Sequence, residues 1–166
     1  MALISKEFND AINKQIKEEL DSGYLYLGMS YWLEEKAFHN LANWYYLQAQ
    51  EEYVHAKKFM DYIAETGGTV ELLALAKPKS DWKSVKEIID AGYAHEQHIT
   101  GCIVNLVKLS EKINEYQARS MLQWFIDEQV EEEANATELI DRHAGFKNDM
   151  LFDQHTTRAA EAASEE

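Results

Sequence analysis

The sequence contains little cysteine, proline or glycine. Of its 166 residues, one is Cys, one is Pro and seven are Gly. The single thiol, Cys102, excludes an internal disulfide and any cysteine-based zinc or rubredoxin-type site. A chain with one thiol suits a reducing compartment, so a cytoplasmic location is expected. So few helix breakers favour long helices over a loop-rich or disordered chain.

The sequence is also poor in positive charge and in long apolar runs. Lys and Arg total 16 against 30 Asp and Glu, which gives a net charge of −14. A surface this acidic repels phosphate backbones and anionic membranes, so neither nucleic acid nor a membrane is expected as a partner. No apolar run approaches the length of a membrane span, and the N-terminus lacks the pattern of a signal peptide. Cations are the expected partners.

Apolar residues recur at helical spacing over four long stretches of the chain. Helices are predicted at about residues 6–36, 40–65, 84–111 and 114–144, with a short fifth helix at about 150–162. Ser84 and Glu87 match a capping box at the start of the third helix. Asn114, with Gln117 three residues later, is predicted to start the fourth helix, and Gly145 follows its end.

The lengths of the connections predict the topology. The first and second helices, and the third and fourth, are joined by only a few residues, so each pair must be antiparallel. The connection at 66–83 has about 18 residues and can span nearly 60 Å when extended, whereas a 28-residue helix is only about 42 Å long. The predicted fold is therefore an all-α four-helix bundle with one long crossover. We expect residues 1–166 to form a single domain whose terminal AAEAASEE sequence frays.

Polar residues interrupt the apolar heptad stripe near the middle of each long helix. An isolated ionised carboxylate in an apolar core costs several kcal/mol unless it is paired or coordinated. The interrupting residues lie about 11 to 15 positions into their helices, so they meet at one level in a bundle of antiparallel helices. They are Glu19, Glu52, Glu96 and Gln129.

A 77-residue offset relates the two halves of the chain. The residues related by it are Glu19 with Glu96, Glu51 with Glu128, Glu52 with Gln129, and His55 with Glu132. The two helix pairs thus present similar constellations, which indicates two half-sites that together hold two metal ions. Hard oxygen ligands with a single imidazole suit Fe(II), Mn(II) or Zn(II).

Other residues near this pattern have simpler interpretations. Tyr26 follows Glu19 by two turns and either packs in the core or supports the site, whereas Trp124 is more consistent with packing than with electron transfer. Five further histidines have no partner pattern, and we expect them to be solvated or to cap helices. They are His39, His95, His98, His143 and His155.

At these motifs the chain closely resembles the non-haem ferritins of prokaryotes. The matching segments are EELDSGYLY, QAQEEYVHA, AHEQ and LQWFIDEQVEEE. The resemblance covers essentially the whole chain, including the long crossover and the short fifth helix. It implies oxidation of Fe(II) by O2 or H2O2 and storage of the ferric product inside a shell of 24 identical subunits.

The resemblance also implies roles for individual residues. One iron would be bound by Glu19, Glu52 and His55, and a second by Glu52 as a bridge, Glu96 and, more weakly, Gln129. Tyr26 matches the tyrosine beside this di-iron centre. A third iron position maps onto Glu51, Glu128, Glu131 and Glu132.

Departures from related families narrow this interpretation. The second half has Gln129 and Glu132 where bacterioferritin keeps a Glu-x-x-His motif, and Tyr53 stands where bacterioferritin has its haem-ligating methionine. No haem is therefore expected. One cysteine also excludes the four-cysteine domain of rubrerythrin. The alternatives are a rubrerythrin- or bacterioferritin-like di-iron oxidase or peroxidase that retains its metals, and a metal-free helical scaffold whose acidic stripe binds partners.

Overall fold

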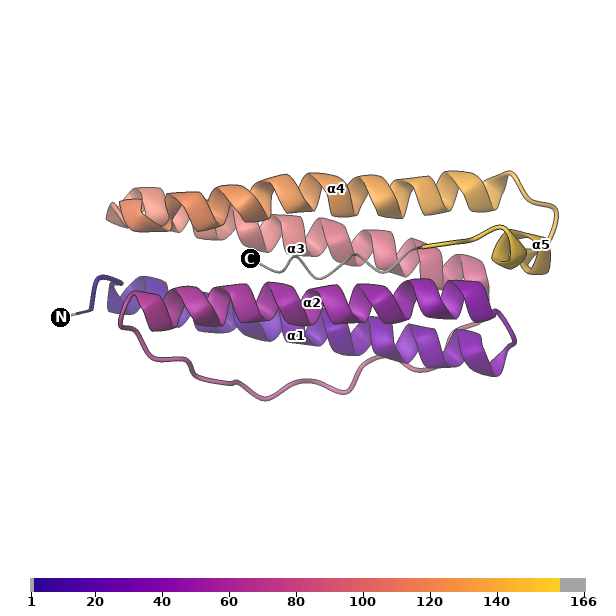
Figure 1. Ribbon diagram of the computed structural model, residues 1–166, viewed down its shortest axis with the longest axis horizontal. Coiled ribbons are helices and arrows are strands. Elements are labelled where there is room, and N and C mark those ends of the chain that lie inside the picture. Colours follow the sequence, from indigo (N-terminus) through magenta and orange to yellow (C-terminus); the bar gives the residue numbers. More distant parts are fainter. Residues whose placement is uncertain (1, 159–166) are drawn as a thin grey trace.

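The structure is a computed structural model, and it describes residues 2–158. Two long helical hairpins pack side by side to form a four-helix bundle (Figure 1). The elements are α1 (Lys6–Glu35), α2 (His39–Glu65), α3 (Val85–Ile113), the 3-10 turn η1 (Tyr116–Ala118), α4 (Arg119–Ala144) and α5 (Asp149–Gln154). The predicted all-α bundle is confirmed. Within the described range, no helix is long and apolar enough to cross a membrane.

Side-chain caps fix where two of the long helices begin. Ser5 Oγ accepts a hydrogen bond from Phe8 N at 3.3 Å at the start of α1. Ser84 Oγ accepts one from Glu87 N at 3.1 Å at the start of α3, as the capping motif predicted. Each of these caps satisfies a backbone N–H that has no partner within the helix.

The predicted start of the fourth helix at Asn114 is wrong. Asn114 instead ends α3, in the left-handed conformation (φ 59°) that Asn tolerates better than most residues. The 3-10 turn η1 follows, and α4 begins only at Arg119. The predicted fifth helix is also too long, because α5 ends at Gln154 and residues 155–158 are not helical. Its expected continuation to 162 and the expected fraying of the tail lie outside the described residues.

The long connection between α2 and α3 runs the length of the α1–α2 hairpin (Figure 1). It is fastened to α1 by side chains, since Thr69 O accepts from Asn9 Nδ2 and from Asn13 Nδ2, each at 3.0 Å. The connection returns the chain to the end of the bundle where α2 began. α2 and α3 therefore run parallel, as the loop length predicted.

A polar layer divides the core into two apolar clusters. The cluster at one end includes Phe8, Phe59 and Phe125, and the cluster at the other end includes Met29 and Ile88, all of which are buried. Buried polar residues occupy the region between the clusters. This layer is where the candidate site lies.

Candidate metal centre

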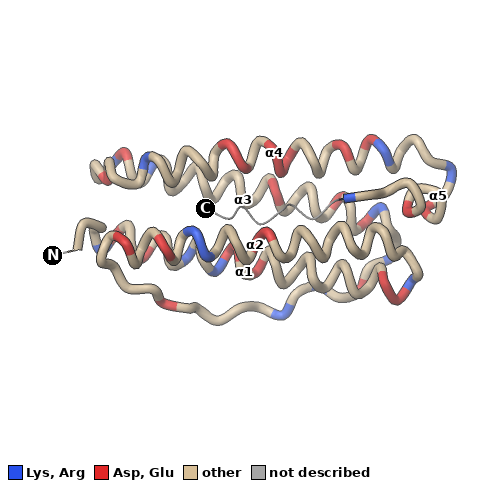
Figure 2. Tube along the Cα trace, viewed as in Figure 1, with Lys and Arg blue, Asp and Glu red and all other residues tan. Residues whose placement is uncertain are grey.

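All four long helices contribute buried polar side chains to the layer at their mid-length. Acidic positions occur there on each of the four long helices (Figure 2). Each of the following residues is no more than 5% exposed: Glu19 of α1, Gln48, Glu52 and His55 of α2, Glu96 of α3, and Gln129 and Glu132 of α4. The structure thus buries all of the predicted di-iron ligands at one level of the bundle.

Three of the predicted ligands converge on one point. One ligand atom from each of Glu19, Glu52 and His55 lies within 4.8 Å of the other two. Glu52 and His55 are three residues apart on α2, so their side chains share one face of that helix. His55 Nδ1 lies 3.2 Å from Glu52 Oε2. Two carboxylates and one imidazole form a donor set that suits Fe(II), Mn(II) or Zn(II).

One oxygen of Glu19 is buried without a hydrogen bond. Glu19 Oε1 accepts from Gln15 Nε2 at 2.9 Å, whereas Oε2 has no partner among the described residues. A buried polar atom left unpaired costs about 1–3 kcal/mol, and more when it is charged. A cation beside this oxygen would remove the cost. The residues present therefore fit a bound metal ion.

Glu96 and Gln129 form a second polar group. Tyr26 donates its hydroxyl hydrogen to Glu96 Oε1. Gln129 Nε2 lies 3.4 Å from Glu96 Oε2 and 3.2 Å from Thr100 Oγ1. The structure brings this predicted pair together, but neither residue belongs to the cluster around Glu19.

The residues predicted for a third iron position are only partly gathered. His55 Nε2 lies 3.5 Å from Glu128 Oε1, and His55, Glu128 and Glu132 offer ligand atoms within 4.8 Å of one another. His55 therefore lies between two groups of carboxylates. Glu131 is exposed, and it is not part of this cluster.

Arg158 contacts the remaining residue of the predicted third position. After α5 the chain turns back between α2 and α4 (Figure 1), and the Arg158 guanidinium forms an ion pair with Glu51. It also donates to Gln48 Oε1 and stacks over the Trp44 ring, with its Cζ 4.7 Å from the ring centroid. The protein's own cation thus lies where the sequence predicted an iron ligand.

Burial and mutual repulsion favour protonation of the carboxyls in this layer. Burial, followed by the charge of Glu52, raises the pKa of Glu19 well above its usual value. The same two causes raise the pKa of Glu96 to about 7. Burial, followed by the charge of Glu96, raises the pKa of Glu132 well above its usual value. Without a cation these groups hold protons, which a metal ion would displace on binding.

The imidazole of the cluster also keeps its proton, but for a different reason. Burial disfavours the charged form of His55, but hydrogen bonds to Glu128 and Glu52 outweigh burial and leave its pKa well above the usual value. The metal-free layer is therefore held together by an imidazolium that neighbouring carboxylates stabilise. A metal ion that binds His55 must displace that proton as well.

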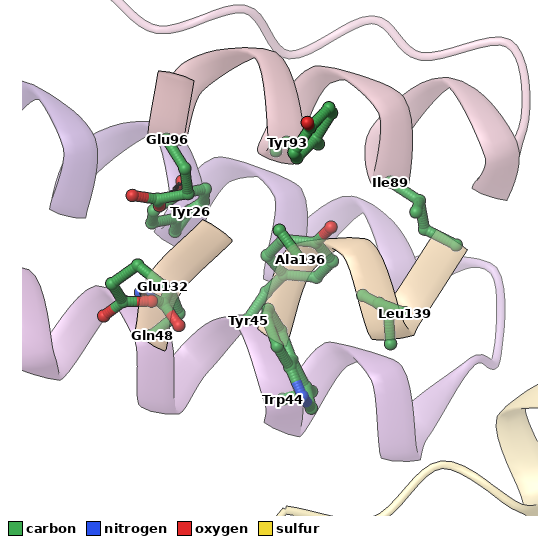
Figure 3. A pocket seen from close by; sticks show the side chains of 11 residues that line it. Tyr26, Trp44, Tyr45, Gln48, Ile89, Tyr93, Glu96, Glu132, Ala136 and Leu139 are labelled. Atoms are coloured by element: carbon green, nitrogen blue, oxygen red, sulfur yellow. Dashed lines mark hydrogen bonds between the residues drawn. The ribbon is translucent and has the colours of Figure 1, made fainter. Parts of the chain in front are cut away.

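A small cavity adjoins the Glu96 side of the layer. Figure 3 shows Glu96, Tyr26, Gln48 and Glu132 directed toward one space between the helices. The cavity measures about 10 Å³, which is about the space that one water molecule requires. A cavity of this size admits one water molecule at most, and no organic substrate.

Two supporting residues in the layer were not predicted as part of the site. Gln15 binds Glu19, and Gln48 Nε2 lies 2.8 Å from Glu132 Oε2 and 3.4 Å from Glu52 Oε1. Both residues lie four positions before a predicted ligand on the same helix face, and that spacing could have indicated them. Gln48 thereby links the carboxylates of α2 and α4.

Trp124 and His155 have the structural roles expected for them. Trp124 packs against His55, with ring centroids 5.6 Å apart, and Lys58 Nζ lies 4.3 Å from the centroid of its ring. His155 does cap a helix, since its Nδ1 lies 2.8 Å from Leu151 O at the end of α5.

Of the remaining four histidines, His39 and His98 are solvated as expected, with side chains 65% and 55% exposed, whereas His95 and His143 are partly buried. His95 lies 2.7 Å from Ser22 Oγ. Three others pair with carboxylates: His39 with Glu34, His98 with Glu18, and His143 with Asp149. Partners brought together by the fold therefore account for these side chains.

The fold and the site together define a class. Two antiparallel hairpins joined by one long crossover, with carboxylates and an imidazole projecting into the middle of the core, are typical of helical-bundle proteins that bind metal ions between carboxylates.

Comparison with known proteins refines this class. The family model described as the ferritin-like domain matches residues 9–145. The chain is 35% identical over 154 residues to the bacterial non-heme ferritin of Staphylococcus saprophyticus, covering 93% of this chain and 90% of that protein. It is 36% identical over 140 residues to the bacterial non-heme ferritin of Campylobacter jejuni, covering 84% of each chain.

The solved structures agree with the sequence comparison. An open pore ferritin from the hyperthermophilic archaeon Archaeoglobus fulgidus superposes with a TM-score of 0.91 at 34% identity, covering 96% of this chain and 99% of the other. The chain belongs to the ferritin family.

Proposed function

We propose that this protein stores iron, and that it oxidises Fe(II) to Fe(III) with O2 or H2O2 at the buried layer without using haem. The observation that carries the proposal is the cluster of Glu19, Glu52 and His55. Within it, Glu19 Oε2 is buried and accepts no hydrogen bond from any of the described residues. Such a cluster is costly without a cation and well suited to Fe(II). The names of the ferritin relatives support the same function.

In this proposal two Fe(II) ions bind as substrates on either side of Glu52. Glu19 and His55 complete one position, and Glu96 with Gln129 completes the other. Three carboxylates neutralise most of the charge of two ferrous ions, and anionic oxygen ligands stabilise Fe(III) relative to Fe(II). Two adjacent irons can each give one electron to the same O2, which then takes up two protons and leaves as H2O2.

The second position is weaker than the first, because the amide oxygen of Gln129 is a poorer ligand for Fe(II) than the imidazole of His55. Gln129 also has competing hydrogen-bond partners in Glu96 and Thr100. A weaker position releases ferric product more readily, which suits an oxidase that supplies a stored mineral. It does not suit an enzyme that retains its metals. The small cavity beside Glu96 agrees with this preference, since it offers no space for an organic substrate.

We also propose a third iron position formed by Glu51, Glu128, Glu131 and Glu132. Four carboxylates make a hard, highly charged site that favours Fe(III) over Fe(II). Arg158 competes for this position, since it forms an ion pair with Glu51. Iron bound here would therefore displace a guanidinium as well as protons.

The central experiment compares single-turnover oxidation of Fe(II), at two irons per chain, in Glu52→Ala and His55→Ala variants. Glu52→Ala should nearly abolish the fast phase, because losing the bridge weakens both positions. His55→Ala should cost less, because it removes a neutral ligand from one position. A Glu138→Gln variant, altered at an exposed residue of α4, is the control. Initial rates close to wild type in Glu52→Ala would refute the assignment.

Assembly offers a separate test of storage. We propose a shell of 24 chains of 19.2 kDa, with a total mass of about 460 kDa by simple multiplication. Gel filtration should show a particle of that size, and it should accumulate many irons per chain in air. A monomer or dimer that turns over without accumulating iron would favour the oxidase that retains its metals.

A further inference from the structure

A third cluster of side chains that could hold a metal ion lies between α1 and α3. Glu18, His98 and Cys102 each offer one ligand atom, and these three atoms lie within 4.8 Å of one another. Glu18 directly precedes the buried Glu19, and one step along a helix rotates a side chain by about 100°. Glu18 therefore projects from a different face of α1 and does not join the buried layer.

The spacing of the ligand atoms resembles that of a bound metal. His98 Nε2 lies 2.9 Å from Glu18 Oε2 and 3.6 Å from Cys102 Sγ. Ligands at about 2.0–2.3 Å from a tetrahedral Zn(II) are separated from one another by roughly 3.3–3.7 Å. The distance between sulfur and nitrogen needs no adjustment, and the Glu18 contact needs to open by only about half an ångström.

The helices position these ligands independently of any metal. His98 and Cys102 are four residues apart on α3, so they lie on the same face one turn apart. Glu18 approaches from α1, and its side chain is 33% exposed while that of His98 is 55% exposed. A cation can thus reach the cluster from solvent without passing through the core.

The chemistry of the donor set differs from that of the buried layer. One thiol, one imidazole and one carboxylate form a mixed set that favours borderline-soft divalent cations, whereas the layer consists mainly of hard oxygen ligands. Burial, together with the charges of Glu18 and Glu19, raises the pKa of the Cys102 thiol. A divalent cation would replace the thiol proton and neutralise the nearby carboxylate.

We propose that Glu18, His98 and Cys102 bind a divalent cation of the Zn(II) class on the α1–α3 surface, separately from the buried iron centre. Three protein ligands leave the fourth position of a tetrahedral ion for water. The bound ion would join α1 to α3 at a point where the two hairpins meet. This proposal departs from the expectation that one cysteine excludes a cysteine-based zinc site, because a single thiol suffices when the fold supplies the other donors.

Co(II) is a suitable probe, because thiolate-to-Co(II) charge transfer absorbs in the near ultraviolet. Cys102 is the only cysteine in the chain, so a charge-transfer band in the reduced protein reports on this cluster and not on the buried layer. Titration of the native protein with Co(II) should produce the band, and Zn(II) should abolish it. Cys102→Ser should remove the band, and Glu18→Ala or His98→Ala should weaken it strongly.

The affinity for Zn(II) and a matched control variant make the test quantitative. Perturbing even an indirect partner of a metal ligand typically costs roughly 10–100-fold in affinity, so His98→Ala should weaken Zn(II) binding at least about tenfold. His39→Ala is the matched control, because His39 lies 2.9 Å from Glu34 in a similar pair and is not part of a metal-binding cluster among the described residues. That variant should retain the full band and the full affinity.

Thiol reactivity provides a second measurement that requires no optical band. Zn(II) should slow the reaction of Cys102 with a disulfide reagent in the native protein, but not in His98→Ala. Two outcomes would overturn the proposal. One is the absence of a thiolate band in fully reduced protein, and the other is a band and protection that persist unchanged in both Glu18→Ala and His98→Ala.

Discussion

Replacing Glu96 by glutamine should make the metal-free protein more stable at neutral and alkaline pH while it impairs iron oxidation. The carboxyl is buried, and its pKa is raised to about 7 by burial and then by the charge of Glu52. Glutamine has nearly the same shape and retains an oxygen that can accept the Tyr26 hydrogen bond. It cannot become charged, so the cost of a buried anion disappears.

The pH window follows from the two states of this group. An unfolded glutamate releases its proton near pH 4.5, whereas folded Glu96 keeps its proton up to about pH 7. Glu96 therefore makes its full contribution to the free energy of unfolding below pH 4.5, and this contribution is lost as the pH rises to 7. Each pH unit in that window costs about 1.4 kcal/mol per proton, so the loss approaches about 3 kcal/mol at pH 8.

Chemical denaturation of chelator-treated protein between pH 4.5 and 8, followed by tryptophan fluorescence, measures this effect. The slope of unfolding free energy against pH should be smaller in Glu96→Gln than in wild type by up to about 1.4 kcal/mol per pH unit. Glu111→Gln, at an exposed glutamate of the same helix, should leave the slope unchanged. Equal slopes in wild type and Glu96→Gln, or a less stable variant at pH 8, would refute the reasoning.

Three further predictions concern the surroundings of the centre. Replacing three proposed third-position residues together by alanine should preserve the fast two-iron phase and change the iron-to-oxygen stoichiometry. Loss of the fast phase would instead assign these residues to the two-iron site. These residues are Glu51, Glu128 and Glu131. Arg158→Ala should preserve the fast phase and speed recovery of the centre in repeated Fe(II) additions, because Glu51 no longer pairs with a guanidinium; unchanged recovery would contradict that competition. Tyr26→Phe removes the hydrogen bond to Glu96 and should slow oxidation by less than Glu52→Ala does, as stopped-flow absorbance would show.

Much of the fold was predictable because local signals and the global arrangement agree. The capping sequence at Ser84 begins α3, and the length of the connection before it permits the parallel crossover. The buried layer was predictable for a similar reason. Carboxylates such as Glu19 and Glu96 stand on an apolar stripe, where an uncompensated charge is too costly to occur without a function.

The errors arose where one residue type serves two opposite ends of a helix. Asn114 has the chemistry of an N-cap, but it adopts the left-handed conformation that ends α3.

Arg158 carried no signal because its partner Glu51 is 107 residues away and no periodicity relates them. The clustering of Glu18 with Cys102 was missed because these partly buried residues lie off the apolar stripe that marks the core.

The division of the core explains why changes in the metal centre should spare the fold. Buried apolar residues form one cluster on each side of the polar layer, and the two clusters contain large side chains such as Phe59 and Phe125 in one and Leu41 in the other. Burying each such side chain contributes about 1.5–3 kcal/mol, so the bundle does not depend on the layer for its stability. In the metal-free state, ionising the buried carboxyls of the layer opposes folding, since burial and mutual repulsion penalise their charge. Ligand substitutions should therefore separate function from stability, which makes the kinetics of the variants a direct measure of each residue's role.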